Sequence, residues 1–244
     1  MKSVVVGGTA GIGREIAVAL AAMGHSLLIT GKDVQDVDAC TANLRLLYGI
    51  DVYGLAIQAS DHPSFSAALE KAAVSFGAIN FLFLPIGASI KKDNGNLTIQ
   101  DLTEILNSNL YSVIMSVQVF RSQFIKEGSA GVIGFSSVAA IRGRKENVFY
   151  SASKRALESY FESLKIILYG SNISVKFYRL GYVDTYQSYG KQLIFSKKDP
   201  KKAAKKIVNN LNRTRLVSYF PNYWRVVELL IRITPNKLYR RITS

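Results

Sequence analysis

The sequence of 244 residues predicts an α/β fold, in which a doubly wound parallel sheet of about seven strands carries helices on both faces. Short apolar runs alternate with longer amphipathic stretches, which is the order expected of successive strand–helix–strand units. Runs that are apolar throughout, such as Phe81–Leu84, suit strands that are buried on both faces of a parallel sheet. A glycine-rich turn follows the first run and opens the first amphipathic stretch, as in folds that bind nucleotides.

This alternation gives each element its place in the chain. Strands are expected at residues 3–7, 26–30, 52–57, 80–84, 131–136, 173–178 and, on a weaker pattern, 216–220. Helices are expected at residues 11–23, 33–47, 63–76, 98–126, 149–169 and 200–211. The sequence has no internal repeat and no linker rich in Pro, Gly or Ser. Residues 1–220 are therefore expected to form one domain, with a substrate loop at about residues 185–199 and a basic, amphipathic tail at residues 221–244.

Composition and charge exclude several classes of protein. Hydrophobic residues make up 48% and charged residues 20%, which is typical of a globular rather than a disordered chain. The lone Cys40 and only two histidines argue against a disulfide framework and against a metal site built on Cys or His, so no metal is expected. The N-terminus lacks a secretory signal pattern, and no apolar run reaches roughly 18 residues. A cytoplasmic protein, or one peripheral at the inner face of a membrane, is expected.

The positive charge lies mostly at the C-terminal end of the chain. The formal net charge is +14, and residues 191–244 hold 14 of the 31 Lys and Arg residues but only two acids, Asp199 and Glu228. Such an asymmetry concerns the partners of a protein rather than its fold.

The first strand–helix junction predicts a dinucleotide site. Its sequence is Gly7-Gly8-Thr9-Ala10-Gly11-Ile12-Gly13, spaced G-x-x-x-G-x-G. Glycines let the backbone approach a pyrophosphate, whose charge the free N–H groups and the helix dipole favour. The second strand ends at Gly31-Lys32-Asp33, where a basic residue favours NADP and an acid favours NAD. Lys32 favours NADP; Asp33 keeps NAD open, although it could simply cap the next helix.

Tyr150 and Lys154 lie four positions apart, so they share one face of a predicted helix. A lysine ammonium near the phenol would lower the pKa of Tyr150 and favour its ionisation. Ser137 could hold a carbonyl or hydroxyl oxygen beside that phenol. The three residues together predict an acid/base site that serves hydride transfer to a ketone, whereas Y-x-x-x-K alone is a common pattern on surface helices.

With these residues in place, the chain resembles the short-chain dehydrogenase/reductase family along nearly its whole length, which implies a Rossmann-type fold. The family's T-G-x-x-x-G-x-G turn is matched by VGGTAGIG, with Val6 where the threonine is usual. Its helix asparagine is matched by Asn109, its serine by Ser137 and its Y-x-x-x-K by Tyr150 and Lys154. Its P-G-x-x-x-T segment is approximated by residues 180–185. Three departures from the pattern matter: Leu84-Pro85-Ile86-Gly87 stands for N-N-A-G and keeps only the glycine, Gln58 replaces an acid that meets the adenine, and Leu180 replaces a proline.

The resemblance implies a role for each matched residue. Tyr150 would be the general acid in reduction, Ser137 would orient the substrate oxygen, and Asn109 would hold a water in a proton relay to Lys154. Residues implied to contact the cofactor are Gly7, Thr9, Gly11, Ile12, Gly13, Lys32, Gly87, Tyr150, Lys154, Val183 and Thr185. The implied function is an NADPH-dependent reduction of a ketone to a secondary alcohol. The alternative is a non-catalytic NAD(P)-binding regulatory or scaffold protein, which would have no need of all four catalytic residues.

The basic tail bears on the substrate and on partners. An apolar stripe is expected at Val226, Val227, Leu229, Leu230 and Ile233, flanked by Tyr223, Trp224 and several basic residues. This segment could lie on an anionic membrane, or its apolar face could pack on the body or on a second subunit of a homo-oligomer. It is similar in texture to the tail of polyprenyl-phospho-sugar ketoreductases, which implies a sugar or lipid-linked keto substrate. Nucleic acid is disfavoured, because the lysine run lacks interleaved aromatic residues.

Overall fold

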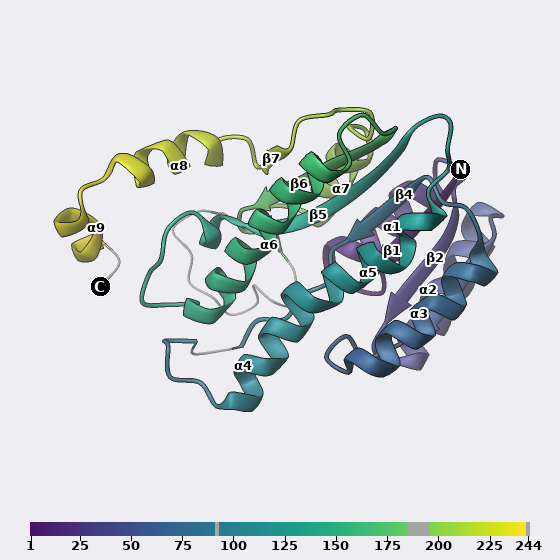
Figure 1. The fold of residues 1–244 in the computed structure, drawn as a ribbon, viewed down its shortest axis with the longest axis horizontal. Coiled ribbons are helices and arrows are strands. Elements are labelled where there is room, and N and C mark those ends of the chain that lie inside the picture. The colour runs from purple at the N-terminus through teal and green to yellow at the C-terminus, as the bar shows by residue number, and fades with distance from the viewer. Residues whose placement is uncertain (91–92, 185–195, 243–244) are drawn as a thin grey trace.

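In the computed structural model, which describes residues 1–90, 93–184 and 196–242, one seven-stranded sheet forms the centre of the molecule (Figure 1). The strands lie in the order β3-β2-β1-β4-β5-β6-β7, and every neighbouring pair is parallel. Their bounds are β1 Lys2–Val6, β2 Ser26–Gly31, β3 Val52–Ala56, β4 Phe81–Leu84, β5 Ala130–Ser137, β6 Ile173–Leu180 and β7 Val217–Phe220. The order reverses at β1, so the sheet is of the doubly wound, Rossmann type that the sequence predicts.

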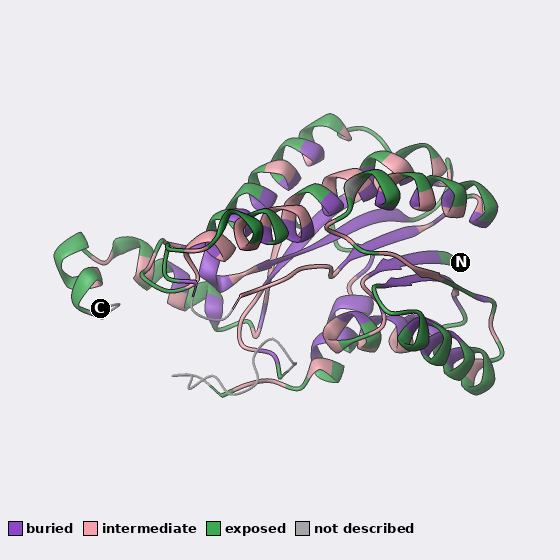
Figure 2. Cartoon of the chain, turned by 90° about the horizontal axis from the view of Figure 1, so that it is seen from below, coloured by how far each residue is buried: buried purple, intermediate pink, exposed green. Residues whose placement is uncertain are grey.

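Helices cover both faces of the sheet, as Figure 2 shows by the buried strands between two exposed helical layers. One face packs against α1 (Gly11–Ala21), α2 (Val34–Tyr48) and α7 (Pro200–Val208), through a core that includes Ile16, Leu44 and Ile207. The opposite core takes side chains from α3 (His62–Phe76), α5 (Ser112–Phe120) and α6 (Val148–Ile167). Strands buried from both sides explain why runs such as Phe81–Leu84 contain no polar residue.

The predicted helix at residues 98–126 is the element that differs most from the structure. It is divided into α4 (Ile99–Leu106), a π-helical turn η1 (Asn107–Tyr111), α5 and a 3-10 turn η2 (Arg121–Gln123). The amphipathic pattern continues through all four segments, so hydrophobic periodicity alone could not reveal the change of helix type. A single π turn inside an α-helix is often found at a functional site.

Two further helices follow β7 and extend from the end of the sheet (Figure 1). These are α8 (Trp224–Ile233) and α9 (Asn236–Ile242). Trp224 and Glu228 of α8 are buried, whereas four members of the predicted apolar stripe are exposed: Val226, Leu229, Leu230 and Ile233. The described residues include no helix that is both long and apolar enough to cross a membrane.

Candidate active site

The glycine turn folds tightly at the carboxyl end of β1. Gly7 has a φ of +87°, and the amide groups of Gly7 and Gly8 donate to the Thr30 carbonyl oxygen at 3.1 and 2.8 Å. A Cβ atom on Gly13 would lie only 2.0 Å from the Gly7 carbonyl oxygen, so a side chain there would push α1 away from the strand. No side chain caps α1 at its N-cap residue, Ala10. The helix therefore begins with backbone N–H groups suited to a pyrophosphate.

The end of β2 lies directly beside this turn. A Cβ atom on Gly31 would lie 2.5 Å from the Thr9 methyl group, so this position has no room for an acidic side chain. Asp33 instead caps α2, since its Oδ1 accepts from the Asp36 amide at 3.1 Å. Lys32 is exposed, as is Arg14 at the start of α1. No motif in the sequence marks Arg14. Its positive charge acts to lower the pKa of the Cys40 thiol in α2, so Arg14 lies near this end of the sheet.

Apolar contacts replace the asparagines that the family pattern has after β4. Leu84 is fully buried, and Pro85 and Ile86 lie against the glycine turn. A Cβ atom on Gly13 would lie 3.1 Å from Pro85 Cγ, and one on Gly7 would lie 3.2 Å from Ile86 Cα. The departure at residues 84–86 thus leaves the turn supported by packing.

Asn109 lies in the π turn η1 and holds the segment after β4 in place. Its Oδ1 accepts from the Ala88 amide at 2.7 Å, and its Nδ2 donates to the Ala88 carbonyl and to Ser153 Oγ, both at 3.0 Å. A Cβ atom on Gly87 would lie 2.8 Å from Asn109 Oδ1 and 3.1 Å from Lys154 Nζ. The structure therefore brings Asn109, Gly87 and Lys154 together.

Lys154 is buried in α6 and donates from Nζ to the Phe135 carbonyl at 3.0 Å. The same ammonium lies 5.9 Å from the centroid of the Tyr150 ring. Burial lowers the pKa of Lys154 to about 8, because the low-dielectric surroundings disfavour its charged form.

Tyr150 and Ser137 meet across α6 and the end of β5. Burial raises the pKa of the Tyr150 phenol, whereas a hydrogen bond with the Ser137 side chain and the positive charge of Arg144 lower it. Arg144 belongs to the loop between β5 and α6, and no sequence motif marks it. Ser137 is further fixed because its Oγ accepts from the Ala139 amide at 3.1 Å in the 3-10 turn η3 (Val138–Ala140).

Asp93 is a further residue near the site that sequence reasoning missed. It is 4% exposed, and its carboxylate accepts from the Phe149 amide at 3.2 Å and from the Tyr150 amide at 2.9 Å. Asn147, the N-cap residue of α6, has a left-handed φ of 57° and makes no capping hydrogen bond with its own side chain. Asp93 therefore caps the helix of Tyr150 from a distant segment.

The last part of the candidate site that the structure describes is the segment after β6. Val183 is buried and forms a bridge with Lys198, and the Asp184 amide donates to the Lys198 carbonyl at 2.9 Å. Thr185 and residues 186–195 of the expected substrate loop lie outside the described residues. Gly181 packs against α8, since a Cβ atom there would lie 2.0 Å from Trp224 Nε1.

The chain is similar in sequence to several known proteins. The family model "short chain dehydrogenase" matches residues 2–192. The 3-oxoacyl-(acyl-carrier-protein) reductase of Aquifex aeolicus is 28% identical over 183 residues, covering 75% of this chain and 74% of the relative. The L-2,3-butanediol dehydrogenase of Corynebacterium glutamicum is 28% identical over 186 residues, covering 75% of this chain and 72% of the relative.

Solved structures share the fold at lower identity. A short chain dehydrogenase from Burkholderia cenocepacia, in complex with NADP, has a TM-score of 0.77 at 24% identity and covers 86% of this chain and 89% of its own. A short chain dehydrogenase/reductase from Burkholderia phymatum, in complex with NAD, has a TM-score of 0.84 at 19% identity and covers 95% of this chain and 92% of its own.

Proposed function

The chain belongs to the short-chain dehydrogenase family, and from this premise we propose that it reduces a ketone to a secondary alcohol with NADPH. The observation that carries the proposal is the convergence of Asn109, Ser137, Tyr150 and Lys154 beside the glycine turn. A bound nicotinamide dinucleotide would supply the hydride, and the protein would position the substrate and move the proton.

Each side chain has a role that follows from its surroundings. The Ser137 and Tyr150 hydroxyls interact with each other, so both can hydrogen-bond one carbonyl oxygen. Tyr150 is the proton donor to that oxygen as it becomes an alcohol. Lys154 holds positive charge near the Tyr150 ring and would hold the ribose hydroxyls of a bound cofactor. Asn109 positions the segment at Gly87 through its hydrogen bonds with Ala88, and it would hold a water on the way to Lys154.

NADPH is the proposed cofactor. NADH would use the same pyrophosphate site at the glycine turn, so the preference depends on the residues at the end of β2. Gly31 has no room for the acid that would bind a ribose 2′-hydroxyl, and Asp33 is turned to its own helix. Lys32 and Arg14 are the exposed cations at this end of the sheet that would meet a 2′-phosphate. Fluorescence titration tests this preference: NADPH should bind more tightly than NADH, and the variant Lys32→Ala should reduce the difference.

The reaction itself is tested with Tyr150→Phe. NADPH oxidation is followed with a panel of ketones, and the variant is expected to lose activity by at least about a hundredfold, the typical contribution of a general acid. NADPH binding should remain, because phenylalanine fills the same space as the tyrosine ring. Undiminished turnover in Tyr150→Phe would refute the assigned proton donor.

A sugar or lipid-linked keto substrate and an anionic membrane surface form the finer part of the proposal. Val226, Leu229, Leu230 and Ile233 of α8 are between 55% and 67% exposed, and Arg225 lies exposed beside them. Apolar side chains flanked by basic ones suit a helix that lies in the plane of an anionic membrane.

Flotation with liposomes tests the membrane surface. The wild type should float with anionic vesicles and less with neutral ones, and Leu229→Ser combined with Ile233→Ser should reduce flotation. If both forms float equally, α8 does not bind lipid. If the substitutions instead convert a homo-oligomer to a monomer in sedimentation, a second copy of the chain covers this face.

A further inference from the structure

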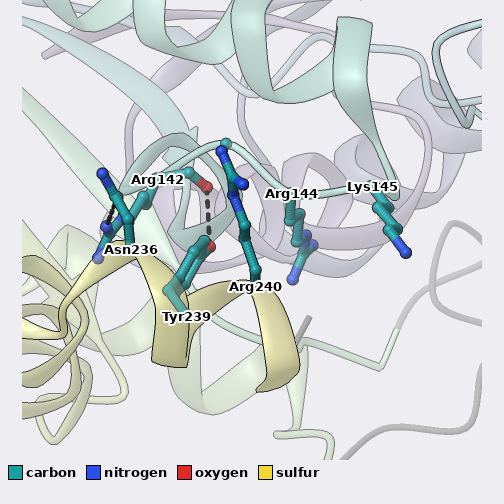
Figure 3. A pocket seen from close by; sticks show the side chains of 7 residues that line it. Arg142, Arg144, Lys145, Asn236, Tyr239 and Arg240 are labelled. Carbon is teal, nitrogen blue, oxygen red and sulfur yellow. Dashed lines mark hydrogen bonds between the residues drawn. The ribbon is translucent and has the colours of Figure 1, made fainter. Parts of the chain in front are cut away.

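A pocket lies between the loop after β5 and the C-terminal helix α9 (Figure 3). Its volume is about 660 Å³, which is within the range of ligand pockets in proteins. It is lined by Arg142, Gly143, Arg144, Lys145, Asn236, Tyr239 and Arg240. Four of these seven residues are cationic, and none is acidic.

Arg142 forms the wall of this pocket and joins its two sides. Its guanidinium donates to the carbonyl oxygens of Ile231 and Thr234 at 2.8 and 2.6 Å, and it also bonds the Asn236 side chain. The ring of Tyr239 lies 4.2 Å from the guanidinium carbon. All these partners are neutral, so the contacts fix the end of α8 and the start of α9 against the loop without compensating the charge of Arg142.

Arg144 and Lys145 add further positive charge. Neither takes part in an ion pair within the described parts of the chain. The Nε atom of Arg144 is buried and has no hydrogen-bond partner there. Figure 3 shows Arg144 extending from the loop towards α9, and Arg240 extending from α9 towards the loop. Several cations that line one concave surface raise the local concentration of an anion there.

We propose that this pocket binds a phosphate group carried by the substrate. Guanidinium groups offer paired N–H donors that match phosphate oxygens, and several cations suit a group that carries more than one negative charge. A single carboxylate would leave most of this charge and volume unused. The inference rests on the proposed function, since it names a group on the same molecule that Tyr150 would protonate.

The position of the pocket connects it with the substrate rather than with the cofactor. Arg144 is close enough for its charge to act on the Tyr150 phenol. The loop that carries it follows β5, whereas Lys32 follows β2, and both β1 and β4 lie between these strands. A 2′-phosphate at the end of β2 and a phosphate at Arg144 would therefore occupy opposite ends of the site.

Titration calorimetry tests the inference without depending on turnover. Glycerol 3-phosphate is the probe and glycerol its uncharged control, each added to protein with NADP present in excess so that the glycine turn is filled. We expect glycerol 3-phosphate alone to bind the wild type. Arg144→Gln and Arg240→Gln should each raise its Kd about tenfold, which corresponds to about 1.4 kcal/mol. The matched control Lys202→Gln removes the same charge from an exposed position of α7 and should leave Kd unchanged.

The outcomes separate the inference from its alternatives. No measurable binding to the wild type, or an equal Kd in all variants, would overturn it, since net charge alone would then account for any attraction. The two arginines come from separate segments, and thermal unfolding of each variant shows whether it has folded. Weaker glycerol 3-phosphate binding in the two arginine variants would still support the phosphate site, even if Tyr150→Phe disproved the proposed reduction.

Vesicles distinguish the two sources of phosphate. If both arginine variants also bind phosphatidylglycerol vesicles less tightly, with phosphatidylcholine as control, the phosphate belongs to a lipid-linked molecule. If only glycerol 3-phosphate binding falls, it belongs to a soluble phosphate ester. Both results support a phosphate site, whereas no change in either probe overturns it.

Discussion

Replacing Asp93 by alanine is expected to weaken both the stability and the activity of the protein, because Asp93 caps the helix that carries Tyr150. The carboxylate is 4% exposed and accepts two backbone hydrogen bonds, at 3.2 Å from Phe149 and 2.9 Å from Tyr150. Both amide groups belong to the first turn of α6, which has no partner for them within the helix. The negative charge also lies at the positive end of the helix dipole.

The size of the effect follows from these contacts. Loss of an N-terminal cap costs about 0.5–2 kcal/mol. The charge–dipole interaction adds about 0.3–1 kcal/mol. Asp93→Ala should therefore lower the free energy of unfolding by roughly 1–3 kcal/mol. Asp93→Asn keeps one acceptor oxygen of two and removes the charge, so it should cost about half as much.

The readout that separates positioning from simple destabilisation is kinetic. Chemical denaturation gives the stability of each variant, and steady-state kinetics are measured well below the unfolding transition. If Asp93 positions Tyr150, kcat falls in Asp93→Ala while KM for NADPH stays near that of the wild type, and Asp93→Asn recovers part of kcat. A variant that loses stability but keeps the wild-type kcat would refute the positioning role.

Two further predictions concern buried charges. Burial lowers the pKa of Lys154 from 10.5 to about 8, so the unfolded state binds this proton more readily and stability should rise as pH increases through this window. Urea unfolding at about pH 8 and about pH 10 should show that Lys154→Met removes about 2 kcal/mol of this rise; an unchanged slope would contradict it. Glu228→Gln leaves the buried Arg179 without one of its two carboxylates and should lower the free energy of unfolding by roughly 2 kcal/mol. The exposed control Glu127→Gln should change it by less than about 0.5 kcal/mol, and equal effects of the two substitutions would count against the ion pair.

Much of the fold could be predicted from the sequence, because each strand is a short apolar run with a turn on either side. Every predicted strand begins and ends within two residues of the observed one, including the weakly patterned β7. The glycine turn could be predicted for a related reason. Close backbone approach at Gly7 and Gly13 requires the absence of a side chain, and glycine is the direct sign of that requirement.

The parts that could not be predicted depend on contacts between distant segments. The π turn at Asn109 keeps the same hydrophobic periodicity as the α-helices on either side. Asp93 caps α6 across more than fifty residues, so no capping pattern precedes Val148 in the sequence. Arg144 acts on Tyr150 only because the loop after β5 folds back over the site, and a lone arginine in a loop carries no signal of that path.

Glu228 gives the C-terminal segment a physical connection to the proposed active site. It is the sole acid after Asp199 in the sequence, and it pairs with Arg179 of β6 at 2.6 Å. Arg179 also pairs with Glu158 of α6 at 2.7 Å, and the Ser136 hydroxyl donates to Glu158 at 2.6 Å. One buried network therefore joins α8 to the helix that carries Tyr150 and Lys154 and to the strand that ends at Ser137.

Because its charges lose their hydration, such a buried network contributes only modestly to net stability. Removing one charged partner is nevertheless costly, since the other charge stays buried without compensation. The docked position of α8 is then well defined, since any other position would leave Arg179 Nη1 without the Glu228 carboxylate that it contacts. Because α9 follows α8 closely and Arg142 contacts both helices, the same network determines where the cations of the pocket at Arg142 and Arg144 lie relative to Tyr150. Under the proposed function, the C-terminal helices thus act as a fixed wall of the substrate site, while four apolar side chains on the outer face of α8 stay exposed.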